Sequence, residues 1–132
     1  MEIIKNGTGR LRVTLFSFGF KHGHPEADLV WDVRFLPNPY WVPALKEYSG
    51  LEQEVARYVL DNEAGQEFLR LVEPLVQFTL NHHHRAKREM IRLAIGCTGG
   101  RHRSVAVTEF LGRALARRDY CVEVFHRDID KR

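Results

Sequence analysis

The chain has 132 residues, of which 44% are hydrophobic and 28% are charged. These proportions are typical of one soluble domain with a single core, and they exclude a disordered chain. No apolar run approaches the length of a membrane span, and the first ten residues lack the basic and then apolar build of a signal peptide. The two cysteines are too few for a disulfide framework. We therefore expect one cytoplasmic domain over residues 1–132, with reduced thiols.

The formal net charge of +3 is unevenly distributed along the chain. Residues 1–84 contain 8 Lys and Arg against 11 Asp and Glu, whereas residues 85–132 contain 12 against 6. A basic C-terminal third suits an anionic partner such as RNA or a phosphorylated metabolite, although such an excess is often only a solvated face. The candidates for contacts with RNA are Arg113, Arg117, Arg118, Arg127, Lys131 and Arg132.

The first half of the chain alternates apolar runs with Pro- and Gly-containing connections. β-Branched and aromatic residues predict a buried strand at residues 11–19 and a second strand at 29–35. Three prolines within residues 36–43 favour an ordered loop. Apolar residues at helical spacing then predict a helix over 51–60.

A second helix is predicted after an N-cap at Asp61 or Asn62. Pro74 lies inside it, lacks an N–H group and should kink the helix near Arg70. The remaining predicted elements are a strand at 92–97, a helix at about 103–117 and a strand at 121–127.

The last three elements form a strand, a glycine-rich loop, a helix and a strand. A crossover helix of this length implies a parallel pair of strands, and ligands of such sheets bind at the carboxyl ends of the strands. We therefore predict an α/β fold, a small three-layer sandwich with a mostly parallel four-stranded sheet. Its site is expected where Gly19, Asp32, Arg34 and Cys97 meet at one edge.

The loop "GCTGGRHRSV" at residues 96–105 has the features of an anion site. Gly99 and Gly100 precede a helix N-terminus, whose unpaired N–H groups and positive dipole end suit a phosphate. The side chains that would complete this site are Thr98, His102, Arg103 and Ser104. The loop matches neither the Walker A pattern nor the dinucleotide fingerprint. A tight turn with its basic side chains in solvent is the alternative.

The same loop contains the pattern C-x5-R-S, which resembles the active-site loop of cysteine-dependent phosphatases. In that alternative Cys97 is the nucleophile, and Arg103 with the helix N-terminus favours its thiolate. Asp32 or Asp128 would protonate the leaving group. Otherwise Cys97 only lines the wall of the site.

Two further segments carry candidate residues. In "WDVRFLPNPYW", Asp32 and Arg34 lie on one strand face, either as a buried ion pair that braces the loop or as groups that hold a sugar hydroxyl or amine and a phosphate. Tyr40 and Trp41 would add a stacking wall. The histidines of "NHHHR" (81–85) diverge around a helix, so we expect no metal site and no cofactor.

Several of these motifs together resemble the C-terminal domain of the RapZ family of RNase adapter proteins. They are "SFGFKHG", "WDVRFLPNPYW", "GL" at 50–51, "IGCTGGRHRSV" and "HRDIDKR", and the resemblance covers residues 11 to 131. It implies an α/β fold, binding of glucosamine-6-phosphate and, in enterobacterial relatives, of small regulatory RNAs presented to an endoribonuclease.

The resemblance also assigns the pocket and shows two departures from the family pattern. The implied pocket residues are Asp32, Arg34, Cys97, Thr98, Gly99, Gly100, His102, Arg103 and Ser104. Tyr40 replaces a His of the enterobacterial pattern and cannot carry its positive charge. We expect the chain to be a version of this domain without the P-loop ATPase domain that family members carry, so an ATPase partner would be a separate protein.

The leading hypothesis is therefore a non-catalytic sensor and adapter domain. It binds a phosphorylated amino sugar at the glycine-rich loop, binds regulatory RNA on its basic surface and forms a homo-oligomer, by family analogy a homodimer. A phosphatase that uses Cys97 is the second hypothesis, and a purely structural or protein-interaction module is the third.

Overall fold

The computed structural model describes residues 2–5, 11–118 and 120–132. The strands are β1 (Glu2–Lys5), β2 (Arg12–Gly19), β3 (Leu29–Asp32), β4 (Met90–Cys97) and β5 (Cys121–His126). The helices are α1 (Gln53–Leu60), α2 (Glu63–Arg85) and α3 (Arg103–Ala116), with short 3-10 turns η1 (Phe20–His22) and η2 (Pro39–Trp41). In this described part of the chain, no helix combines the length and hydrophobicity that crossing a bilayer requires.

The strands form one sheet in the order β1-β5-β2-β4-β3. Strands β5, β2, β4 and β3 are parallel neighbours, which confirms the predicted α/β fold and its parallel strands. The structure adds a fifth strand that the sequence did not predict, because β1 pairs with β5 in antiparallel orientation. Strand β3 ends at Asp32, so Arg34 lies in the following loop and not on the strand as predicted.

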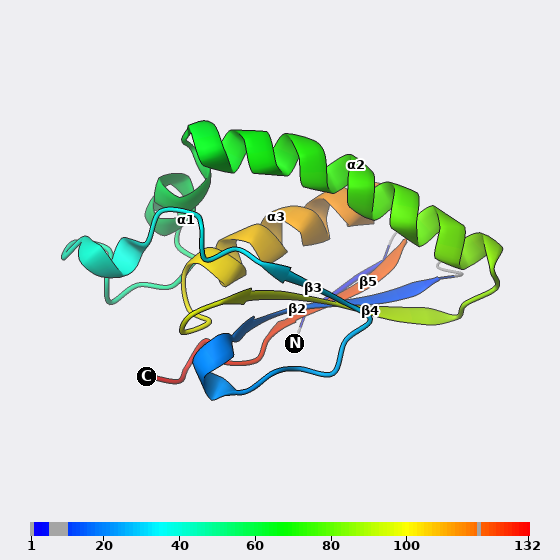
Figure 1. Ribbon diagram of the computed structural model, residues 1–132, viewed down its shortest axis with the longest axis horizontal. Helices are drawn as coiled ribbons and strands as arrows, with labels where there is room; N and C mark the ends of the chain where they lie inside the picture. Colours follow the sequence, from blue (N-terminus) through cyan, green and yellow to red (C-terminus); the bar gives the residue numbers. More distant parts are fainter. Residues whose placement is uncertain (1, 6–10, 119) are drawn as a thin grey trace.

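The chain forms three layers, and this sheet is the middle one. Figure 1 shows the three helices on one face and the connection from β2 to β3, residues 20–28 with η1, across the other face. The steps β3 to β4 and β4 to β5 run in one direction along the sheet, and the step β2 to β3 runs in the opposite direction. A constant crossover hand therefore places the helices and the 20–28 connection on opposite faces.

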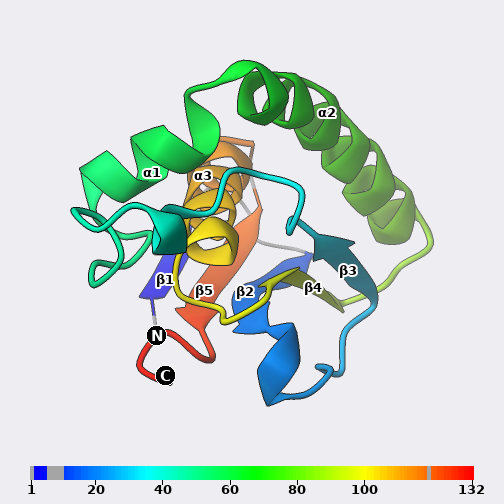
Figure 2. The ribbon, with the colours of Figure 1, turned by 60° about the vertical axis from the view of Figure 1, so that its left-hand side comes forward.

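Helix α3 is the centre of the helical layer, as Figure 2 shows in its position between α1 and the sheet. Of its 14 residues, 11 are buried, since it packs on β2, β4 and β5 and is covered by α1 and α2. Gly112 allows this contact, because a Cβ atom there would lie 2.9 Å from Cγ2 of Val124. Helix α2 continues from Glu63 to Arg85 as one helix with Pro74 inside it.

Three polar side chains are hydrogen-bonded in a row between the sheet and α3. The His126 ring lies 2.7 Å from Oγ of the fully buried Ser17 through Nδ1, and 2.7 Å from the Glu109 carboxylate through Nε2. The hydrogen bond from His126 holds the pKa of Glu109 below its usual range. This pairing satisfies three polar groups that would otherwise be costly to bury, and it ties α3 to β2 and β5.

The fully buried carboxylate of Asp128 ties the segment after β5 to the end of β2. It accepts hydrogen bonds from the Gly19 N–H (2.8 Å) and from Arg127 (2.8 Å), and it forms an ion pair with Lys131 (2.7 Å). Burial by itself would raise the pKa of Asp128, but these donors outweigh it and lower the pKa to about 2. Asp128 is therefore ionised at every physiological pH and has a structural position.

We expect Asp128→Asn to lower the free energy of unfolding by about 2 kcal/mol at neutral pH, the equivalent of the lowered pKa. Because the folded pKa is below the unfolded value, this contribution is present above the unfolded pKa and is lost as pH falls through the folded one. Denaturant titrations from about pH 6 to about pH 2 should show the deficit shrinking. Exposed Asp130→Asn is the control, and a deficit that does not depend on pH would contradict this role.

Candidate functional site

The carboxyl ends of the parallel strands meet at one edge of the sheet, and backbone contact between two glycine segments shapes that edge. A Cβ atom on Gly19 would lie 2.4 Å from the carbonyl carbon of Gly99, and one on Gly100 would lie 2.6 Å from the nitrogen of Gly19. Gly100 also has φ +81°, a conformation that favours glycine. The N–H of Lys21 donates to the carbonyl of Thr98 at 3.2 Å. The turn after β2 and the loop after β4 are therefore packed backbone to backbone.

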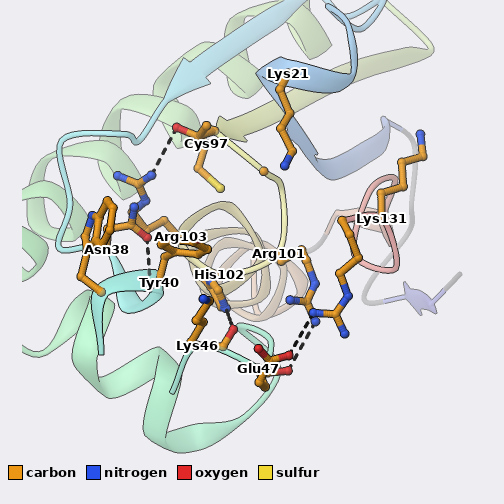
Figure 3. A pocket seen from close by; sticks show the side chains of 14 residues that line it. Lys21, Asn38, Tyr40, Lys46, Glu47, Cys97, Arg101, His102, Arg103 and Lys131 are labelled. Atoms are coloured by element: carbon orange, nitrogen blue, oxygen red, sulfur yellow. Dashed lines mark hydrogen bonds and ion pairs between the residues drawn. The ribbon is translucent and has the colours of Figure 1, made fainter. Parts of the chain in front are cut away.

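A cavity of about 580 Å³ opens beside this contact. Figure 3 shows its side chains converging from η1, from the 38–47 loop, from the 97–103 loop and from the C-terminal segment. The lining residues are Lys21, Asn38, Tyr40, Trp41, Lys46, Glu47, Cys97, Thr98, Gly99, Arg101, His102, Arg103, Lys131 and Arg132. Six of them are Lys or Arg and one is a carboxylate, so the described lining of the cavity is strongly positive.

Arg103 is buried and lies between the cavity and the loop after β3. Its Nη1 donates to the carbonyls of Arg34 (2.6 Å) and Leu36 (3.3 Å). Its Nη2 reaches Oγ1 of Thr98 at 3.5 Å, at the wall of the cavity. Nη1 of this guanidinium therefore holds the loop after β3, and Nη2 faces the cavity.

His102 holds the 46–50 loop by a hydrogen bond to its backbone. Its Nε2 donates to the carbonyl of Lys46 at 3.0 Å. Burial lowers the pKa of His102, despite the carbonyls of Tyr48 and Lys46 that favour its charged form. Gly50 packs directly against this segment, since a Cβ atom there would lie 2.3 Å from the carbonyl oxygen of His102. His102 is therefore neutral at physiological pH and positions the 46–50 loop.

The thiol of Cys97 lines the cavity and is bonded to the first turn of α3. It is 3% exposed, its Sγ donates to Oγ of Ser104 at 3.1 Å, and it accepts the N–H of Ser104 at 3.4 Å. Ser104 is fully buried and does not belong to the cavity lining. Gly100 also lies behind the wall, so both residues shape the loop from outside the cavity.

Asp32 and Arg34 pair with each other in an exposed position outside the cavity lining. The Nη2 of Arg34 lies 2.6 Å from Oδ2 of Asp32, and the two side chains are 48% and 45% exposed. The expectation of a buried ion pair is therefore wrong, because β3 is an edge strand of the sheet. Hydrogen bonds from Arg34 hold the pKa of Asp32 below its usual range, and the Arg34 guanidinium stacks 4.1 Å from the Phe20 ring centroid.

The two aromatic residues predicted for the wall line the cavity, and so do Lys21 and Lys46, which sequence reasoning missed. Tyr40 and Trp41 line the cavity, and the Lys46 ammonium lies 4.5 Å from the centroid of the Tyr40 ring. Asn38 caps η2 by accepting the N–H of Tyr40 at 3.1 Å. Lys21 lies two residues after the end of β2, which is a signal that the strand-end rule could have used. Lys46 lies within a loop and had no such signal.

Comparisons with known proteins show the family of the chain. The family model described as the RapZ C-terminal domain matches residues 11–130. This chain belongs to the RapZ C-terminal domain family. Nucleotide-binding proteins of Bacillus thuringiensis (strain Al Hakam), Bacillus mycoides (strain KBAB4) and Bacillus cereus (strain B4264) are each 51% identical to it over 122 residues. The match covers 92% of this chain and 41% of each relative, so the RapZ C-terminal domain described here spans about two fifths of their length.

The motifs that resemble RapZ lie far apart in the sequence, but they meet around the cavity. The segments after β2 and β3, Gly50, the 97–104 loop and the residues after β5 all surround it. Their glycines and hydrogen bonds mostly hold neighbouring loops together. The geometry of one strand-end edge therefore brings together motifs that lie far apart in the sequence of this RapZ domain.

The basic residues proposed for RNA form two separate groups at opposite ends of α3. Arg113, Arg117 and Arg118 belong to the C-terminal end of α3, where Arg113 pairs with Glu109 and Arg118 with Glu73. The other three follow β5 at the cavity edge and pair with carboxylates: Arg127 and Lys131 with Asp128, and Arg132 with Glu47. In the described part of this RapZ domain, no three His, Cys, Asp or Glu side chains are grouped to hold a metal ion.

Replacing Arg103 with Lys should lower the free energy of unfolding by about 1–3 kcal/mol, because Lys keeps the charge but cannot bond two carbonyls with one planar group. Denaturant unfolding measures this loss. The same Arg→Lys exchange at exposed Arg57 on α1 is the matched control and should change stability by less than about 0.5 kcal/mol. Equal effects at the two positions would contradict the loop-holding role of Arg103.

Proposed function

We propose that this domain is a non-catalytic sensor and adapter whose cavity binds a phosphorylated amino sugar similar to glucosamine-6-phosphate. The observation that carries the proposal is the cavity itself, with six cationic side chains and one carboxylate around about 580 Å³. This volume is within the range of small-molecule sites. The N-terminus of α3 follows the loop and adds its positive dipole end.

The distribution of charge suggests which end of the ligand lies where. The Lys21 ammonium, the exposed Thr98 hydroxyl and the free side of Arg103 surround Gly99, which suits a phosphate. Glu47 lies on the far side of the cavity in Figure 3 and is the only carboxylate among its described lining residues. An amino group of the ligand would find its acceptor there.

A sensor fits the lining of this cavity better than a phosphatase does. Cys97 contacts the cavity, so the nucleophile of the alternative is present. The two acids considered for the phosphatase are poorly suited to protonate a leaving group, however, because both have lowered pKa values: Asp32 is paired with Arg34, and the buried Asp128, with a pKa of about 2, does not line the cavity. A carboxylate that stays ionised cannot protonate a leaving group at neutral pH.

Titration calorimetry tests the ligand. Glucosamine-6-phosphate should bind, and Thr98→Val or Lys46→Gln should weaken it about tenfold by removing a hydrogen bond or a charge. Glu47→Gln should reduce the preference for the amino sugar over glucose-6-phosphate. Arg57→Gln on α1 removes one charge away from the cavity and should leave the affinity unchanged.

The outcomes separate the hypotheses. Equal binding of glucosamine without phosphate would contradict the proposed cradle. Release of inorganic phosphate that is lost in Cys97→Ser would favour the phosphatase. No binding of any of these sugars would favour the structural or protein-interaction module.

We also propose, from the family, that the domain binds small regulatory RNA and acts with an endoribonuclease or with a separate P-loop ATPase protein, as a cytoplasmic homo-oligomer. The exposed arginines at the end of α3 and Arg132 beyond β5 support an RNA contact. Contacts with phosphates release counterions, so affinity should fall steeply as salt rises.

Gel-shift titrations at several salt concentrations test the RNA proposal. Arg117→Gln combined with Arg118→Gln should weaken binding and reduce the slope of log affinity against log salt by about 1–2, one unit for each lost phosphate contact. Glu54→Gln on α1, a charge change away from both basic groups, is the control. Absence of a shifted band, or an affinity that does not respond to salt, would contradict RNA binding.

A further inference from the structure

Most of the cations around the cavity are not paired with carboxylates. Of the six that line it, Lys131 pairs with Asp128 and Arg132 pairs with Glu47. Within the described residues, the other four form no ion pair with a carboxylate, and they are Lys21, Lys46, Arg101 and Arg103. Positive charge that the protein does not neutralise raises the potential inside a cleft. The cavity therefore suits a ligand with several negative charges.

An amino sugar with a single phosphate uses only part of this positive charge. A phosphate monoester carries about −1.5 to −2 at neutral pH, and a protonated amino group on the same sugar offsets about one of these charges. The contacts proposed for that phosphate are Lys21, Thr98 and Arg103. Lys46 and Arg101 then remain without an anionic partner, so the cavity has cations to spare on one side.

The Lys46 ammonium is held in place over an aromatic ring. It lies 4.5 Å from the centroid of the Tyr40 ring, and the face of such a ring attracts a cation. The carbonyl of Lys46 accepts a hydrogen bond from His102 at 3.0 Å, which fixes the backbone of the same residue. Figure 3 shows Lys46 on the side of the cavity opposite Lys21. A cation is therefore positioned where a second anionic group of the ligand would reach it.

Arg101 adds a second cation beside the segment of Lys46 and Glu47. Its Nε donates to the carbonyl of Ile129 at 2.9 Å, and its Nη2 reaches the carbonyl of Glu47 at 3.5 Å. A guanidinium has five N–H donors, so further donors remain for a ligand. The Glu47 carboxylate follows Lys46 directly in the chain, which places an acceptor for an amino group next to cations for a phosphate. In a hexosamine the C2 amino group is likewise next to C1.

We propose that the cavity contains a second anion subsite, formed by Lys46 and Arg101, and that its preferred ligand is a hexosamine with phosphates on C1 and C6. The inference rests on the proposed sugar-phosphate site and names a more highly charged ligand class for it. The C6 phosphate lies in the cradle at Gly99, the C1 phosphate contacts the second subsite and the amino group faces Glu47. Tyr40 is a positioning residue, because its ring holds the Lys46 ammonium.

Titration calorimetry with glucose-6-phosphate, glucosamine-6-phosphate, glucose-1,6-bisphosphate and glucosamine-1,6-bisphosphate tests the second subsite. Each bisphosphate should bind at least about tenfold more tightly than the matching monophosphate, because it gains charge-assisted hydrogen bonds. In Lys46→Gln this ratio of affinities should fall about tenfold. Thr98→Val, in the cradle for the first phosphate, should weaken both kinds of sugar and leave the ratio unchanged.

Two substitutions at Tyr40 test its positioning role. Tyr40→Leu removes the ring and should lower the ratio about threefold, whereas Tyr40→Phe keeps the ring and should retain the ratio of the parent. Arg57→Gln on α1 should leave all four affinities unchanged. Every variant should keep the unfolding midpoint of the parent, which separates a lost contact from lost folding. Equal ratios in Tyr40→Leu and Tyr40→Phe would overturn the role of the ring.

The remaining outcomes separate this inference from the function on which it rests. Glucosamine-6-phosphate that binds as tightly as the bisphosphates would overturn the second subsite and leave the proposed sensor intact. An unchanged ratio in Lys46→Gln would overturn the assignment of the subsite to Lys46. Binding of the bisphosphates alone would support the subsite and replace the monophosphate as the ligand. Failure of all four sugars to bind would overturn both proposals.

Discussion

The contact between Gly19 and the Gly99–Gly100 segment is the constraint on which the strand-end edge depends. Two backbone segments approach so closely that a single methyl group on either side would lie 2.4–2.6 Å from backbone atoms of the other. The buried carboxylate of Asp128 accepts the Gly19 N–H and brings the segment after β5 to the same point. The ends of β2, β4 and β5 are thereby held together at one point. The cavity opens beside this junction.

Two side chains of the glycine-rich loop extend this junction to more distant loops. Arg103 bonds the carbonyls of the loop after β3, and His102 bonds the carbonyl of Lys46. Buried backbone carbonyls need donors, and the loop supplies them from residues that the sequence suggests for ligand binding. The cations with the most freedom to meet a ligand are therefore on neighbouring segments, at Lys21 and Lys46. The positive potential of the cavity is assembled from four parts of the chain.

The other distinctive surface, the outer side of α2, is independent of this junction. Its buried side packs on the core through Val72, Val76 and Leu80, and its outer side exposes Leu71, Leu75 and Phe78. The proposed ligand site and this exposed apolar stripe therefore lie on separate elements. A change at one site need not alter the other, unless α3, which contacts both α1 and α2, transmits it.

The sequence by itself determined the α/β class, the four parallel strands and the loop at 96–105, because periodicity and glycine placement are local properties of the chain. It did not reveal β1, a four-residue strand that exists only through its partner β5. It did not reveal that the Asp32–Arg34 pair is half exposed, because the edge position of β3 is a property of the assembled sheet. Only the tertiary structure decided that burial lowers the pKa of His102 and that one side of the Arg103 guanidinium donates to backbone carbonyls. It also decided that Lys21 and Lys46 line the cavity. These properties depend on which loops lie together at the strand ends. Packing between segments that are far apart in the sequence decides that arrangement.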